Sequence, residues 1–78
     1  PEPGALAGAQ ETLETALGNA CALGDRGVEP LLHEQLARVA QARGDGEARG
    51  RELREAHRLF TVNGADGHVR RLTAELQL

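Results

Sequence analysis

The stretch Arg51-Glu-Leu-Arg-Glu-Ala-His-Arg-Leu-Phe60, followed by Thr-Val-Asn-Gly64, decides the fold of this chain. Its apolar residues Leu53, Ala56 and Phe60 recur at intervals of three and four, which places them on one stripe of an amphipathic helix. Gly64 comes shortly after them, where a helix commonly ends on a left-handed residue. The stretch therefore predicts a helix that packs one face against its neighbours and stops at a glycine.

Three other segments repeat this pattern, so the sequence predicts four helices joined by short turns. The first covers Ala5 to Leu23. The second has Pro30 in its first turn, where the missing N–H costs nothing, and ends at Gly44. The third runs from an N-cap at Asp45 to about Asn63, and Asp66 is expected to cap the fourth. The predicted apolar stripes are Leu6, Ala9, Leu13, Ala16, Leu17, Ala20 and Leu23 in the first helix, Leu32, Leu36, Val39 and Ala40 in the second, and Val69, Leu72 and Leu76 in the fourth.

The composition predicts one small all-α domain over residues 1–78. Forty per cent of the residues are apolar and 27% are charged, which is typical of a globular chain. Phe60 is the only aromatic residue, and β-branched residues are scarce, so the core suits close helix packing better than a sheet. Because the chain begins at Pro1 without a methionine, we expect a fragment of a larger protein.

The charge pattern argues against a nucleic acid or a membrane as the partner. The formal net charge is −3, and no run approaches the ~20 apolar residues of a membrane span. The arginines of the second half alternate with acidic residues and lack aromatic stacking partners, which is typical of a solvated helix face. Glu47–Arg51 and Arg51–Glu55 are neighbours at i,i+4 there. Cys21 is the only cysteine and cannot form an internal disulfide, so a cytoplasmic setting is expected.

No cluster of residues predicts catalysis, a metal or a cofactor. His33, His57 and His68 lack the spacing of a zinc site, although His57 and His68 could approach each other across the turn at Gly64. Cys21 has no base at a fixed spacing, and we expect a small buried hydrophobic residue there. The glycine-rich segments 44–46 and 64–67 lack the Gly-Lys-Ser/Thr ending of a phosphate loop and are interpreted as turns.

An internal repeat points to stacked helical hairpins. Shifting the chain by 40 residues brings identical residues together at core and turn positions. The pairs are Leu13 with Leu53, Ala16 with Ala56, Gly24 with Gly64, Gly27 with Gly67, Leu32 with Leu72, and Leu36 with Leu76. A helical pair that recurs at this spacing predicts a short α-solenoid of two antiparallel hairpins, in which each hairpin buries a face on the next.

The segments 36–45 and 52–56 resemble a tetratricopeptide repeat (TPR). That family has Leu-Gly/Ala in its first helix, a Gly-Asp turn, and a Leu followed three residues later by Ala in its second helix. The matching residues are Leu36, Ala37, Gly44, Asp45, Leu53 and Ala56. The chain departs from the family at Ala40, where a tyrosine-type residue is usual. It also departs early in the second helix, where the small residue falls near Ala48 or Arg49, and in its long spacing.

A more specific resemblance covers Glu29 to Leu78. The segments 30–37, 44–45, 51–60 and 63–68 look like the C-terminal helical-repeat tail of large bacterial signalling proteins. Those proteins carry an adenylate/guanylate cyclase domain and an ATPase module of the AAA type upstream of the repeats. Thr61-Val-Asn63 departs from the family, in which an acidic residue and a Met more often precede the glycine.

The resemblance implies a non-catalytic protein-interaction or regulatory repeat at the C-terminus of a cytoplasmic signalling cyclase/ATPase. Its partner would be a protein, a peptide, another domain of the same chain or a second subunit. Two alternatives stay open: a sensor repeat of a large transcriptional regulator, and a free-standing small helical domain that dimerises. The two-hairpin fold also predicts an unmatched apolar face near the first helix, which would promote self-association. No single residue is predicted to bind the partner.

Overall fold

The chain folds into four α-helices without strands over residues 3–78, the part that this computed structural model describes. The helices are α1 (Pro3–Leu23), α2 (Glu29–Ala42), α3 (Gly46–Val62) and α4 (Asp66–Leu76). This confirms the predicted all-α fold. One predicted cap is wrong, because Ala65 is the N-cap of α4 and Asp66 is its first helical residue. The Asp66 carboxylate instead lies near the positive end of the helix dipole.

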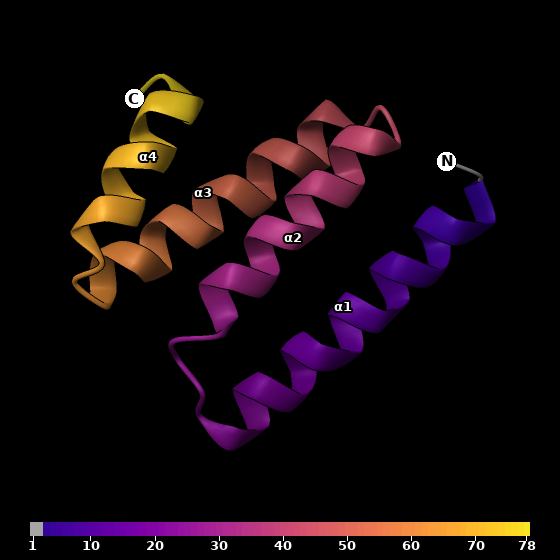
Figure 1. Ribbon diagram of the computed structural model, residues 1–78, viewed down its shortest axis with the longest axis horizontal. Helices are drawn as coiled ribbons and strands as arrows, with labels where there is room; N and C mark the ends of the chain where they lie inside the picture. Colours follow the sequence, from indigo (N-terminus) through magenta and orange to yellow (C-terminus); the bar gives the residue numbers. More distant parts are fainter. Residues whose placement is uncertain (1–2) are drawn as a thin grey trace.

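The helices lie side by side in chain order, and each runs antiparallel to the one before it (Figure 1). α2 packs against α1 on one side and α3 on the other, and α4 packs against the far side of α3. The molecule measures 36 × 32 × 16 Å along its principal axes. Because a helix with its side chains is roughly 10–12 Å across, the short dimension of 16 Å describes a flat molecule that is somewhat thicker than one helix.

Three glycines with left-handed backbone end the first three helices. Gly24, Gly44 and Gly64 have φ values of 70°, 77° and 73°, and they recur every 20 residues. In each turn the amide after the glycine donates a 2.9 Å hydrogen bond to a carbonyl five residues earlier, which is the Schellman closure. The donor–acceptor pairs are Asp25 with Ala20, Asp45 with Ala40, and Ala65 with Phe60. The predicted glycine stops are therefore confirmed.

The turn before α2 and the end of α3 are tied to each other. The side-chain amide of Asn63 donates a 2.8 Å hydrogen bond to the carbonyl of Arg26. The end of α3 therefore helps to fix the turn that joins α1 to α2.

α4 ends in the same kind of closure as the other helices, but with a non-glycine residue, Gln77, at φ 60°.

The buried core lies where α3 meets α2 and α4. Ala37 of α2, three residues of α3 and Leu72 of α4 form one cluster, and Ala65, Val69 and Leu76 pack against it. Ala37, Leu53, Ala56 and Leu72 are fully buried, and Phe60 is 3% exposed. Two of these five residues are alanine, so the backbones of α2 and α3 approach closely. The predicted stripe of α3 is thus the centre of the core.

The helix α1 is less deeply buried than α2 and α3. Only Ala20 is buried, while the other stripe residues that face α2 are half-buried. Ala9 and Leu23 were predicted to lie on this stripe, but both are exposed, Leu23 by 84%. Two side chains three residues apart on a helix point roughly 60° away from each other. Leu23 follows Ala20 by three residues and is the last residue of the helix, so it lies at the edge of the stripe.

The pairs related by the 40-residue shift lie at corresponding places in α1–α2 and α3–α4. Gly24 and Gly64 end their helices with almost the same φ value. Leu13 and Leu53 both face the core side, although Leu13 is only half-buried. Gly27 and Gly67 differ, since Gly27 lies in a turn and Gly67 lies within α4.

The left-handed glycines can be tested by a matched pair of alanine substitutions. Gly64 and Gly18 both have open space where a Cβ would stand, but only Gly64 has a positive φ. We expect Gly64→Ala to lower the free energy of unfolding by about 1 kcal/mol, since the left-handed region is strained for alanine. Gly18→Ala, in the middle of α1, should raise it by about 0.5–1 kcal/mol. Urea unfolding followed by circular dichroism measures both changes, and a gain in stability for Gly64→Ala would contradict the assigned turn.

Candidate interaction groove

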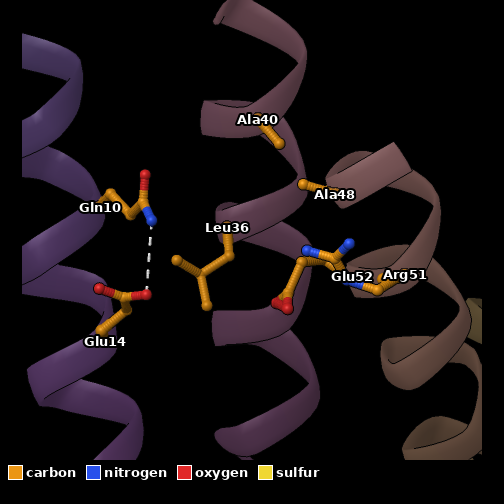
Figure 2. A pocket seen from close by; sticks show the side chains of 7 residues that line it. All are labelled: Gln10, Glu14, Leu36, Ala40, Ala48, Arg51 and Glu52. Carbon is orange, nitrogen blue, oxygen red and sulfur yellow. Dashed lines mark hydrogen bonds between the residues drawn. The ribbon is translucent and has the colours of Figure 1, made fainter. Parts of the chain in front are cut away.

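A shallow pocket of about 100 Å³ opens between α1 and α3, with α2 as its floor (Figure 2). Small-molecule sites usually enclose ≈ 300–1,000 Å³, so this pocket is too small for a typical ligand. It has room for about three water molecules or one aliphatic side chain. The lining residues are Gln10, Glu14, Leu36, Ala40, Ala48, Arg51 and Glu52. We call this feature the groove.

The floor of the groove is apolar and the α1 wall is polar. Leu36 and Ala40 are 8% and 7% exposed, and the Leu36 side chain points toward α1 (Figure 2). On α1, the amide of Gln10 donates a 3.4 Å hydrogen bond to Glu14. The Gln10 carbonyl oxygen accepts a hydrogen bond from Arg43, which closes one end of the groove. Apart from Gln10, no partner of the Glu14 carboxylate is found in the described residues.

Acidic residues of α3 near the groove contact basic residues other than Arg51. Glu52 lies 3.0 Å from Nδ1 of His33 on α2. Glu55, which the sequence places one turn from Arg51, binds Arg58 instead, with contacts of 2.5 and 3.0 Å. These hydrogen bonds are the main reason that the pKa of Glu55 is lowered. Arg51 therefore forms no ion pair within residues 3–78.

The opposite face of the molecule carries an ionic network that joins α2 to α4. Arg38 of α2 binds both oxygens of Glu75 on α4, at 2.6 and 3.1 Å. Arg49 of α3 reaches the same carboxylate at 2.8 Å. One turn earlier, Arg71 of α4 binds both oxygens of Glu34 on α2, at 2.6 and 2.8 Å, and Glu34 also contacts Arg38 at 3.2 Å. The Glu34–Arg38 pair, at i,i+4 within α2, is thus part of a larger network.

The network shifts the titration of both carboxyl groups. The hydrogen bonds from Arg38 are the main cause of the lowered pKa of Glu75, and those from Arg71 are the main cause for Glu34. The same bonds raise the pKa values of Arg38 and Arg71. Both carboxylates are therefore held in their charged form, and the network stabilises the fold while they stay ionised.

Each histidine has its own partner on a neighbouring element. His33 faces Glu52, whereas Nε2 of His57 lies 2.9 Å from the hydroxyl of Thr73. The His68 ring stacks on Phe60 with centroids 4.3 Å apart, and its Nδ1 lies 2.8 Å from Arg71. Since a guanidinium can only donate, Nδ1 is the acceptor there. Residues 3–78 contain no group of three His, Cys, Asp or Glu side chains that could hold a metal ion.

Cys21 is exposed, so the expectation of a buried residue is wrong. The stripe of α1 faces α2 at Ala20, and the next residue points about 100° away from it. The thiol lies 2.8 Å from Oε1 of Glu29 and donates to it. This hydrogen bond is the first cause of the raised pKa of Cys21, followed by desolvation and the charge of Glu29. A thiol held in its protonated form is a poor nucleophile.

The glycine-rich segments are turns, as predicted. Gly44 ends α2, and Asp45 then caps α3 by accepting a 3.0 Å hydrogen bond from the amide of Ala48. Gly64 ends α3 in the same way, and Gly67 already lies in α4. Helix stops and helix starts thus account for both segments.

Comparisons with protein-family models, with curated proteins and with solved structures find no match to this chain. Within residues 3–78, no helix has both the length and the apolar character needed to cross a membrane. The function therefore has to be argued from the groove, the ionic network and the order of the helices.

The ionic network makes a prediction about pH. A lowered carboxyl pKa in the folded state gives stability that is complete above the ordinary Glu value of about 4.3 and lost as the pH falls through the lowered value. We expect Glu75→Gln to lower the free energy of unfolding by about 1 kcal/mol at pH 7, because Glu75 joins two arginines. The variant should also lose less stability than the parent between about pH 5 and 3.

Urea unfolding at a series of pH values measures both effects. Glu47→Gln is the matched control, because Glu47 is also on a helix surface but forms no ion pair within residues 3–78. Equal effects of the two substitutions would show that the network does not stabilise the docking of α4.

Proposed function

We propose that this chain is a non-catalytic protein-interaction repeat, built as a short TPR-like solenoid of two helical hairpins. The order in which the helices pack carries this proposal. Each helix packs against its neighbours in sequence, and helix stops of one kind recur every 20 residues. Repeat proteins have this organisation, because each unit buries its apolar face only on adjacent units.

The positions of the residues that match the TPR pattern support this proposal. Ala37, Leu53 and Ala56 are buried where α2 meets α3, and Leu36 is buried on the side of α2 that faces α1. The Gly-Asp turn between these helices has both a left-handed glycine and a capping aspartate. These features support a TPR-like hairpin formed by α2 and α3. The proposed interaction role is supported by the polar side chains, because those best suited to chemistry contact one another between helices.

The proposed partner is a protein or peptide, another domain of the same chain, or a second subunit. A random peptide library displayed on phage, selected against the 78-residue chain, tests this role. We expect selected peptides to bind with micromolar Kd and to shift the amide NMR signals of one continuous surface. A library that yields no binder, or binders whose shifts are scattered over all four helices, would argue against an interaction role.

We further propose that the repeat is the C-terminal part of a cytoplasmic bacterial signalling protein with cyclase and ATPase modules. The support is the resemblance carried by residues 51–60 and the segments around them. The alternatives are a sensor region of a large transcriptional regulator and a free-standing helical domain that dimerises.

The coding sequence upstream of the Pro1 codon separates these proposals. We expect an open reading frame that continues into further helical repeats and a Gly-Lys-Ser/Thr phosphate loop. A DNA-binding helix-turn-helix in that frame would favour the regulator. A start codon a few residues upstream would leave the free-standing domain, for which sedimentation should show one discrete oligomer.

A further inference from the structure

The two walls of the groove carry opposite unpaired charge. The only charged residues of α1 are Glu11 and Glu14, both exposed, and the first arginine of the chain is Arg26. The α3 wall contributes the exposed Arg51. Its half-buried neighbour Glu52 contacts His33 of α2 at 3.0 Å, and Glu55 is paired with Arg58. A partner in the groove therefore meets carboxylates on one side and a guanidinium on the other.

A helix of the partner would pack on top of α2. Packed helices lie roughly 8–10 Å apart, which places the axes of α1 and α3 roughly 16–20 Å apart across α2. The side chains of α1 and α3 leave too little room for a helix roughly 10–12 Å across to lie level with them, so the partner helix rests above α2 and reaches both walls with the long side chains of its two edges. The small residues Ala40 and Ala48 let a helix backbone come close, and the pocket beside Leu36 accepts one aliphatic side chain.

We propose that the groove binds an amphipathic helix of a protein partner with a defined charge pattern. One edge of this helix is basic and faces Glu14 of α1, the other edge is acidic and faces Arg51 of α3, and one aliphatic residue fills the pocket. This inference rests on the proposed interaction role and names the partner's chemistry. Because turning the bound helix end for end exchanges its two edges, the opposed charges also fix its direction.

Synthetic peptides of about 18 residues, long enough to be helical in water when rich in alanine, test the charge pattern. Each carries one leucine and a fluorophore. One peptide has lysines on one edge and glutamates on the other, a second has lysines on both edges, and a third has glutamates on both. Fluorescence anisotropy at low ionic strength should rank the dipolar peptide first, since exposed charges are screened by salt.

Two charge reversals test the walls separately. Arg51→Glu makes both walls acidic, so the dipolar peptide should bind about three- to fivefold more weakly and the all-lysine peptide should become the preferred one. Glu14→Lys makes both walls basic and should shift the preference to the all-glutamate peptide. Both residues are exposed, so the fold should tolerate these changes.

A matched pair of substitutions tests the pocket. Ala48→Leu fills it and should weaken binding at least tenfold, whereas Ala74→Leu, at an exposed position of α4, should leave binding unchanged. Equal effects of these two variants, an unaltered ranking after the charge reversals, or no binding of any designed peptide would overturn the proposal. Phage-selected peptides that map to a surface outside the groove would then leave the interaction role standing while this partner assignment fails.

Discussion

The close approach of α2 to α3 is the contact on which the rest of the structure depends. Ala37 on α2 meets Leu53 and Ala56 on α3, and all three side chains are fully buried. With a single aromatic residue in the chain, the core relies on leucine and alanine, so many of its dispersion contacts come from backbones that lie close together. Small residues at this contact make that approach sterically possible, and α1 and α4 then dock on the outer sides of the pair.

The two outer helices are held by different means. α4 buries Leu72 completely and adds the ion pairs of Arg71 and Glu75, so an apolar contact with α3 is combined with a polar link to α2. α1 has mostly half-buried residues against α2 and only Ala20 buried. Elements with few buried apolar contacts open at the lowest free energy. The two walls of the groove therefore differ. Buried residues hold α3 in place, whereas α1 has fewer buried residues that fix its position.

The sequence predicts the elements of this fold better than its side-chain contacts. Helix period and the glycines at 24, 44 and 64 are local signals, because backbone sterics at one residue determine where a helix stops. The link between α2 and α4 joins residues 37 positions apart. The sequence does contain a signal for this link. Glu34 and Arg38 are four residues apart, as are Arg71 and Glu75, and the order of the two charges is reversed between the pairs. This signal is informative only once α2 and α4 are known to run parallel on either side of α3, with long side chains that meet across it. The exposure of Cys21 likewise depends on where the stripe of α1 meets α2.

The distribution of polar contacts also supports the proposed interaction role. His33, His57 and His68 each contact a different residue, and the arginines that contact carboxylates mostly join one helix to another. A general base or a metal ligand needs a free lone pair directed into a cavity, whereas these side chains form contacts that fix the positions of the helices. Glu14 and Arg51, which form no ion pair within residues 3–78, line opposite sides of the groove, whose floor consists of Leu36 and Ala40. In protein interfaces, an apolar depression anchors a side chain of the partner, and unpaired charges beside it set the orientation of the partner.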